Sequence, residues 1–330
     1  MFVYIDILNL LSLIHSTKEP RYNDCISLLK ETLDIKFTFS KDCIQKLDDD
    51  DKNTIMLWLT TMTDGNCNII WNSAFPKDPI NSNDFKNQLY NSSIYLLDEE
   101  RRDIKKLIEK GTLLISTKGD EIKTLSKLFI KGNQFTKNIF KEIQQWDDLG
   151  KYTSPCSDII IVDSYIFASK ELYDSNIVKL AKILSSHSLN ERLNIVIVTL
   201  RKVRDPKTNI EFEPNWDDLY SRLRKAVNNQ CKCRPNITFI AILKDSLKEH
   251  DRTIFTNYKL FSSGDSYNYF DSKGKKITSG RYLHAHSLAD KDNWSDSKDF
   301  LAKIQELIDN INKINKDCIK KDKICNFLKF

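Results

Sequence analysis

Polar residues that could hold and attack an oxyanion are spaced at short intervals in the later part of the chain. His250 is followed by Arg252 and then, after gaps of four, six and three residues, by Asn257, Gly264 and Asn268. A neutral imidazole is a nucleophile near pH 7, because the ordinary pKa of histidine is about 6.5. An arginine two residues along a strand lies on the same face and can neutralise phosphoryl oxygens. A glycine turn and a carboxamide can add N–H donors to the same oxygens.

This spacing resembles the HKD motif of the phospholipase D superfamily, H-x-K-x4-D-x6-G-S-x-x-N. Arg252 stands in place of the lysine and Asn257 in place of the aspartate. The resemblance implies that His250 is a nucleophile that forms a covalent phosphohistidine without a metal ion. It also implies that Arg252 clamps the phosphate, and that Asn268, helped by Ser266, donates to the phosphate or orients the histidine. Asn257 and Gly264 are then expected to line the substrate site.

The motif departs from the family in ways that bear on catalysis. Arg252 keeps the positive charge but cannot donate a proton as lysine can. Asn257 cannot stabilise a protonated histidine by charge, and Asp265 adds a negative charge where the family has serine. Enzymes of the superfamily combine two such halves, whereas this chain has one. Catalysis would therefore require a homodimer.

The same segment is also similar to the phospholipase D-like C-terminal domain of microtubule-interacting-and-transport domain proteins. The residues that support this are His250-Asp251-Arg252, the spacing to Asn257, and the closing Tyr269-Phe270-Asp271. That family resembles phospholipase D in fold, lacks the full active site and binds membrane phosphoinositides. Two interpretations follow: a metal-independent phosphodiesterase or nuclease that acts as a dimer, and an inactive module that binds nucleic acid, anionic lipid or protein.

The elements before the motif predict an α/β fold with a parallel sheet. Continuous apolar runs indicate strands that are buried on both faces, and apolar residues at helical spacing between them indicate crossover helices. The expected strands are Asp158–Val162, Leu193–Leu200 and Asn236–Leu243, and the expected helices are Ser175–Ser186 and Asp217–Asn229. Ligands of such sheets lie beyond the carboxyl ends of the strands, so Asp163 and Tyr165, which follow the first strand, are further candidates for the substrate site. An ordinary strand end with an Asp helix cap explains them equally well.

Other polar groups give weaker signals. His284 and His286 point the same way along a strand, but no ligand set at metal spacing accompanies them, so no metal site is predicted and His284 is expected to support the substrate site. Arg222 and Lys225 share a helix face and could contact a phosphate backbone, although a solvated face is the commoner explanation. No cofactor is predicted.

The N-terminal part is expected to be a separate α/β domain of unassigned role. Phe2 to Asp6, followed by Asn9, is similar to the opening of PIN- and NYN-like nucleases, where a strand ends in a metal-binding aspartate. Acidic partners that would complete such a site are not evident. The run Asp48–Asp51 is expected to cap a helix beginning near Lys52. Short strands at Asn68–Trp71, Tyr95–Leu97 and Thr112–Ser116, and a helix over Asp98–Lys110, complete this part.

The length and composition predict more than one domain. A chain of 330 residues exceeds what one core usually organises, and the polar stretch Gln145–Ser157 is the best boundary. The expected parts are residues 1–150, a phospholipase D-like domain at 151–295, and a C-terminal helix and basic, fraying tail at 296–330. A net charge of +5 permits nucleic acid or, as the lesser alternative, an anionic membrane surface as a partner.

No apolar run is long enough to span a membrane, and the eight scattered cysteines are expected to be free thiols in a cytoplasmic protein. The sequence thus predicts a protein that recognises phosphodiesters, most plausibly those of nucleic acid. An antiphage effector role is compatible with such a domain by analogy.

Overall fold

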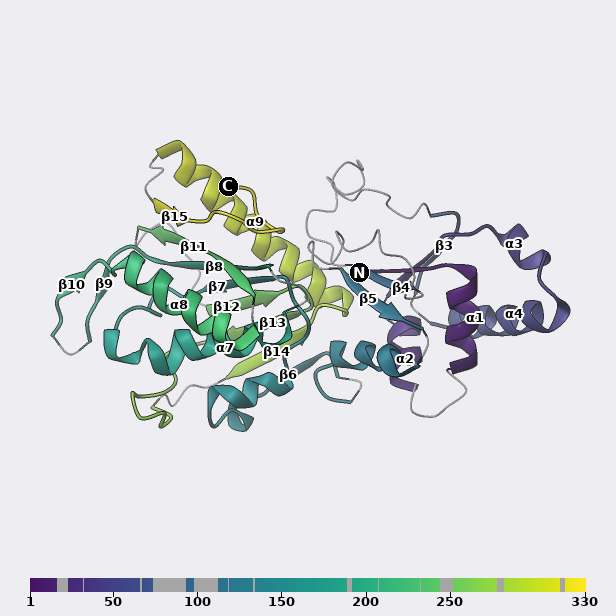
Figure 1. The fold of residues 1–330 in the computed structure, drawn as a ribbon, viewed down its shortest axis with the longest axis horizontal. Helices are drawn as coiled ribbons and strands as arrows, with labels where there is room; N and C mark the ends of the chain where they lie inside the picture. The colour runs from purple at the N-terminus through teal and green to yellow at the C-terminus, as the bar shows by residue number, and fades with distance from the viewer. Residues whose placement is uncertain are drawn as a thin grey trace. The chain divides into compact units, whose positions relative to one another are not determined.

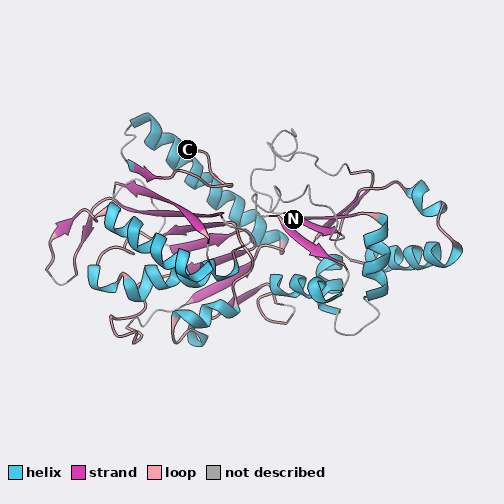
Figure 2. Ribbon diagram, viewed as in Figure 1, coloured by secondary structure: helices cyan, strands magenta, loops and turns pink. Residues whose placement is uncertain are grey.

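The computed structural model describes residues 1–16, 23–31, 33–65, 67–73, 93–97, 112–117, 119–132, 134–188, 192–206, 208–231, 233–243, 252–277, 282–314 and 318–330. The chain divides into two compact units. The first unit comprises Met1–Phe135 and Ser287–Ser295, and the second comprises Thr136–His286 and Asp296–Phe330. Both units combine helices with sheets, as the α/β class predicts (Figure 2). Among the described residues, no helix has both the length and the apolar composition that crossing a membrane requires.

The first unit contains a parallel sheet in the order β3-β2-β1-β4-β5. The strands are β1 (Phe2–Ile5), β2 (Asp34–Phe37), β3 (Ile69–Ile70), β4 (Ser93–Leu97) and β5 (Leu113–Ser116). The helices are α1 (Ile7–Ser16), α2 (Asn23–Glu31), α3 (Lys41–Gln45) and α4 (Asp49–Thr63), followed by a 3-10 segment, η3 (Gly119–Leu128). The central strand β1 is apolar, and Val3 and Ile5 have no exposed surface.

The acidic run caps a helix, as predicted. The Asp48 side chain accepts a hydrogen bond from Asp51 N at 2.9 Å, and α4 begins at Asp49, a little before the expected start. Carboxylates at the N-terminus of a helix also interact favourably with the positive end of the helix dipole. The predicted helix over residues 98–110 lies outside the described residues.

The second unit is built on an 8-stranded mixed sheet in the order β15-β11-β8-β7-β12-β13-β14-β6 among the residues described. Its strands are β6 (Thr136–Asn138), β7 (Asp158–Val162), β8 (Arg192–Leu200), β11 (Arg234–Ile242), β12 (Arg252–Thr256), β13 (Lys259–Ser263), β14 (Leu283–Ser287) and β15 (Ile319–Lys321). The neighbours β7, β8 and β11 run parallel, and β12 runs antiparallel to β7. The strands expected from apolar runs therefore form the parallel centre.

Helices cover both faces of this sheet. Figure 1 shows α7 (Lys179–Leu184) and α8 (Trp216–Cys231) on the near side and α9 (Lys291–Ile314) behind the strands. Burial from both sides explains why every residue of β7, DIIIV, is buried. A two-stranded ribbon, β9 (Val203–Arg204) with β10 (Glu211–Phe212), follows β8.

Three expectations about this unit need correction. The units change at Phe135 rather than near residue 150, because β6 and the buried Trp146 belong to the second unit. The C-terminal tail does not fray: β15 pairs antiparallel with β11, and Phe327 packs edge-to-face on Phe255 at 5.0 Å between ring centroids. Cys233 is disulfide-bonded rather than a free thiol.

The helix that crosses from β7 to β8 also differs from expectation. Its first turn is a π-helix, η7 (Asp174–Val178), and a short 3-10 turn, η6 (Lys170–Leu172), precedes it. The helix ends in a second 3-10 turn, η8 (Ser185–His187). Two further 3-10 turns, η4 (Phe140–Glu142) and η5 (Trp146–Lys151), precede β7.

A buried lysine in this sheet gives a testable pH dependence. Lys259 at the start of β13 has no exposed surface, and burial lowers its pKa well below the ordinary value of about 10.4. Between the lowered and the ordinary pKa, the unfolded chain binds a proton that the folded protein does not. The free energy of unfolding of the wild type therefore rises with pH in that window.

We expect Lys259→Met to stabilise the protein most near pH 7, and its advantage over the wild type to decline as the pH rises toward 10. Urea unfolding at several pH values measures this difference. Lys141→Met, at an exposed position of the same unit, is the control and should show no such trend. An advantage of Lys259→Met that does not vary with pH would contradict the argument.

Candidate functional site

Six of the nine site residues predicted from the sequence gather at the carboxyl edge of the parallel strands of the second unit. Asp163 follows β7 directly, and Arg252 opens β12. Because Thr253 pairs with Val162 in the antiparallel ladder, Arg252 comes opposite Asp163. The turn after β13 brings Gly264 and the residues that follow to the same edge. We call Asp163, Tyr165, Arg252, Gly264, Ser266 and Asn268 the Arg252 cluster.

The carboxylate of Asp163 joins two loops of this cluster. Its Oδ1 accepts from Tyr165 N at 2.9 Å, and its Oδ2 accepts from Ser266 Oγ and Tyr267 N, both at 2.8 Å. The side chain is almost fully buried. Burial raises the pKa of the Asp163 carboxyl, against the opposing effect of these three hydrogen bonds and of the Arg252 charge.

Arg252 is held by a carbonyl and an aromatic ring, and its charge acts on the Asp163 carboxyl. Its Nη1 donates to Gly264 O at 3.0 Å, and its guanidinium carbon lies 5.6 Å from the centroid of the Tyr165 ring. A Cβ at Gly264 would lie 3.1 Å from the Tyr282 ring, so any other residue would require that ring to shift by a few tenths of an ångström. The guanidinium is therefore fixed in position at the edge of the sheet.

Asn268 closes the cluster. Its Nδ2 donates to Tyr165 O at 2.9 Å and to Ser266 Oγ at 3.3 Å. Its Oδ1 is buried and has no hydrogen-bond partner among the described residues. Buried acceptors of this kind are rare in folded proteins.

Asn257 lies away from the cluster, at the opposite end of β12. Its Oδ1 accepts from Ser157 N at 2.8 Å and from Asp158 N at 3.0 Å, and it has no exposed surface. The structure therefore places this residue at the amino end of β7, where it serves the fold. We do not include it among the residues that could contact a substrate.

His284 is not brought to Arg252 by any contact within the described part of the chain. It lies on β14 opposite Asn138, with its ring 5.1 Å from that of Tyr282 and 5.8 Å from that of His286. His286 itself is bonded to Thr136 and Ser262. His284 therefore relates to the Arg252 cluster only indirectly: its ring lies beside that of Tyr282, and the Tyr282 ring lies close to Gly264.

His250 and Asp251 lie outside the described residues. Only their place in the sequence relates them to the cluster, since His250 precedes Arg252 by two residues. The role expected for His250 remains a prediction from the sequence.

A buried asparagine that the sequence analysis missed supports the cluster from behind. Asn176 Oδ1 accepts from Phe270 N at 3.0 Å and from Trp146 Nε1 at 3.2 Å, and its Nδ2 donates to Phe270 O at 2.7 Å. These bonds anchor the segment that contains Ser266 and Asn268 at its far end. Asn176 lies in the π-helical turn η7, a feature that often marks a functional region. Its position beside Ile177 in a helical pattern gave no sign of burial.

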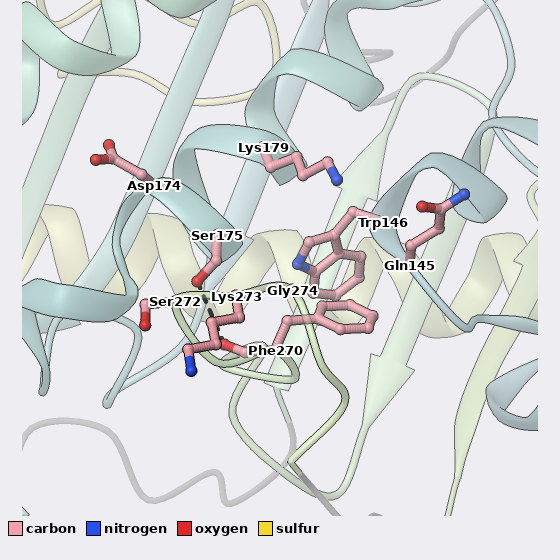
Figure 3. Close-up of a pocket in the computed structure, with 9 residues that line it drawn as sticks. All are labelled: Gln145, Trp146, Asp174, Ser175, Lys179, Phe270, Ser272, Lys273 and Gly274. Atoms are coloured by element: carbon pink, nitrogen blue, oxygen red, sulfur yellow. Dashed lines mark hydrogen bonds between the residues drawn. The ribbon is translucent and has the colours of Figure 1, made fainter.

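A cavity of about 300 Å³ adjoins this support (Figure 3). Trp146 and Phe270 form part of its lining, with ring centroids 5.4 Å apart, and Ser175 Oγ donates to Phe270 O at 3.3 Å. None of the site residues predicted from the sequence lines it. The cavity is therefore a feature separate from the Arg252 cluster.

The predicted basic surface of α8 is partly neutralised. Arg222 Nε pairs with Asp218 at 2.9 Å, and its Nη1 lies 3.3 Å from Asp174. Nearby, Lys320 pairs with Glu213 and Lys321 with Asp217. Arg224 donates to Tyr220 Oη, and Lys225 is exposed with no ion pair among the described residues, so part of the positive charge of this face is not neutralised.

In the first unit, Asp6 lies at the carboxyl end of the central strand β1. Its oxygens accept from Asn9 N at 2.8 Å and from Asn9 Nδ2 at 3.0 Å, and Asn9 Oδ1 accepts from Thr117 Oγ1 at 2.8 Å. Asp6 thus caps α1. Within the described ranges, no group of three or more His, Cys, Asp or Glu side chains is arranged to hold a metal ion. Asp98, which follows β4 in the sequence, lies outside them.

No protein-family model, curated protein or solved structure matches the chain. The resemblance to phospholipase D-like proteins consequently stays a prediction based on the residues of the motif.

We expect Asp163→Asn to lower the free energy of unfolding by about 1–3 kcal/mol, because an amide offers one acceptor oxygen where three donors converge and leaves a buried donor unpaired. Ser266→Ala, which removes one of the donors and keeps the carboxylate, should cost about 1 kcal/mol. Asp265→Asn, at an exposed carboxylate in the same turn, is the control and should stay within about 0.5 kcal/mol of the wild type. Urea unfolding measures all three variants. Equal effects of Asp163→Asn and Asp265→Asn would show that Asp163 does not tether these loops.

Proposed function

We propose that the second unit recognises phosphodiesters, most plausibly those of nucleic acid, and that Arg252 contacts the phosphate. The observation that supports this best is the position of Arg252: at the carboxyl edge of parallel strands, bonded to Gly264 and opposite Asp163. Ligands of open α/β sheets bind at this edge. A planar guanidinium held in one orientation suits the two oxygens of a phosphate better than a flexible ammonium does.

The contacts around Arg252 hold its guanidinium in one orientation, which favours the binding of a small anion. Arg252 is half-buried, and its orientation is maintained by Gly264 O and the Tyr165 ring. Preorganisation of this kind lowers the entropy that binding must overcome. Asp163 does not compete strongly for the ligand's place, because its oxygens already accept from three donors of the protein.

Hydrolysis of the bound phosphodiester would extend this function, and it depends on His250. The likeness to the HKD motif assigns the nucleophile to that residue, and two copies of the chain would supply the attacking histidine and the acid–base partner. The competing interpretation is a binding module without catalysis, which the arginine and asparagine replacements favour. The two interpretations differ in an activity that can be measured directly.

We expect Arg252→Ala to weaken binding of a labelled oligonucleotide about 10- to 100-fold, because it removes a charge-assisted contact. The slope of log K against log salt should fall in magnitude by about one, as expected for the loss of one phosphate contact. Arg234→Ala is the matched control, since it removes the same charge at the amino end of β11, the opposite edge of the sheet. Fluorescence anisotropy at several salt concentrations measures both. Equal losses for the two variants would mean that net charge, and not the Arg252 cluster, accounts for binding.

We expect His250→Ala to abolish any cleavage of DNA, RNA or bis-p-nitrophenyl phosphate that resists EDTA, and to leave oligonucleotide binding within about threefold of the wild type, because the imidazole acts as a nucleophile and not as the phosphate clamp. Wild-type protein that binds but cleaves nothing supports the module without catalysis. EDTA-resistant cleavage that persists in His250→Ala would contradict the assignment. Cleavage that EDTA abolishes and that requires Asp6 would instead point to the first unit.

A further inference from the structure

We propose that the Arg252 cluster takes single-stranded nucleic acid, and that Tyr165 is the platform on which an unpaired base stacks. This inference rests on the proposed function and names the class of phosphodiester that the site would select. It depends on three features of the cluster: an exposed aromatic ring, a backbone fixed by two hydrogen bonds, and a guanidinium over one face of the ring.

The Tyr165 ring is exposed although its backbone is fixed. The residue is 44% exposed, which is unusual for a large aromatic side chain in this unit, where Tyr267 and Tyr269 have no exposed surface. Its N–H donates to Asp163 Oδ1, and its carbonyl accepts from Asn268 Nδ2. Two anchors on one residue hold the ring at the edge of the sheet. An exposed aromatic ring on a rigid support is the arrangement that stacking on a ligand requires.

The ring and the guanidinium are close enough to act on one nucleotide. The centroid of the Tyr165 ring lies 5.6 Å from the guanidinium carbon of Arg252. Because the guanidinium covers one face of the ring, a base would stack on the other face, with its own or the adjacent phosphate toward the cation. Proteins that bind single strands combine these two elements, a cation along the backbone and an aromatic side chain under the base.

The choice of a single strand follows from geometry. A base within a duplex is stacked on both faces by its neighbours, so an aromatic side chain on a sheet edge cannot reach its face. A lipid headgroup offers a phosphate but no aromatic plane, so the exposed ring would contribute little to binding it.

The test compares four ligands: a labelled pyrimidine single strand, the same length of abasic strand, the corresponding duplex, and vesicles that contain phosphatidylserine. Wild-type protein should bind the single strand about 5- to 100-fold more tightly than the abasic strand, which has the same phosphates but no bases. Tyr165→Ala should remove this preference. It should weaken abasic binding less than single-strand binding, because the ring also helps to orient Arg252. Tyr165→Phe, which keeps the aromatic ring, should retain the preference for the single strand over the abasic strand. Because the side chain is half-exposed, both variants are expected to fold, and thermal unfolding checks this.

Each outcome separates this inference from the function on which it rests. If Arg252→Ala weakens the binding of every polymer but Tyr165→Ala changes nothing, stacking is overturned and phosphate recognition stands. If Arg252→Ala has no effect on any ligand, the phosphate site itself is overturned. Duplex binding as tight as single-strand binding, or binding to vesicles in preference to the oligonucleotide, would overturn the choice of a single strand.

Discussion

The carboxylate of Asp163 is the interaction on which the candidate site depends. It is buried at the end of β7 and accepts hydrogen bonds from two segments far apart in the sequence, the loop at Tyr165 and the turn at Ser266 and Tyr267. A buried carboxylate is costly unless several donors satisfy it, so both segments must keep their positions for the charge to be tolerated. The position of the Tyr165 backbone and that of Asn268, which bonds to it, follow from this one requirement.

A second buried network fixes the amino ends of the same parallel strands. Asp158 at the start of β7 accepts from Asn194 Nδ2 at 2.8 Å and from Asn326 N at 2.8 Å, and Asn257 binds the backbone beside it. The C-terminal segment is thereby tied to the amino ends of the parallel strands. Polar residues at the two ends of β7 thus have different tasks, since those at the amino end join segments of the fold and those at the carboxyl end surround a half-exposed cation.

The parallel centre of the second unit could be predicted from the sequence because strands buried on both faces appear as continuous apolar runs. The clustering of Arg252 with Asp163 was also predictable, because Asp163 follows the first of these runs and ligands meet at that edge. The role of Asn257 was not, since spacing along a hairpin does not reveal at which end of the strand a residue lies. Asn176 and β15 were missed for a related reason: their partners, Phe270 and β11, are distant in the sequence and no local pattern indicates such pairings.

The charges near Arg252 limit how this site can select a ligand. The Asp163 carboxyl lies close enough to Arg252 for their charges to interact, so the pair contributes little net charge when both side chains are ionised. Arg222, Lys320 and Lys321 near α8 are paired with acids as well, which reduces the long-range attraction of this face for an anion. Selection at the Arg252 cluster should then depend mainly on short-range contacts, the fixed fork of the guanidinium and the exposed ring of Tyr165. Such contacts discriminate by shape and by the presence of an aromatic plane, which is why the chemistry of the base, and not the charge of the polymer alone, should decide what binds there.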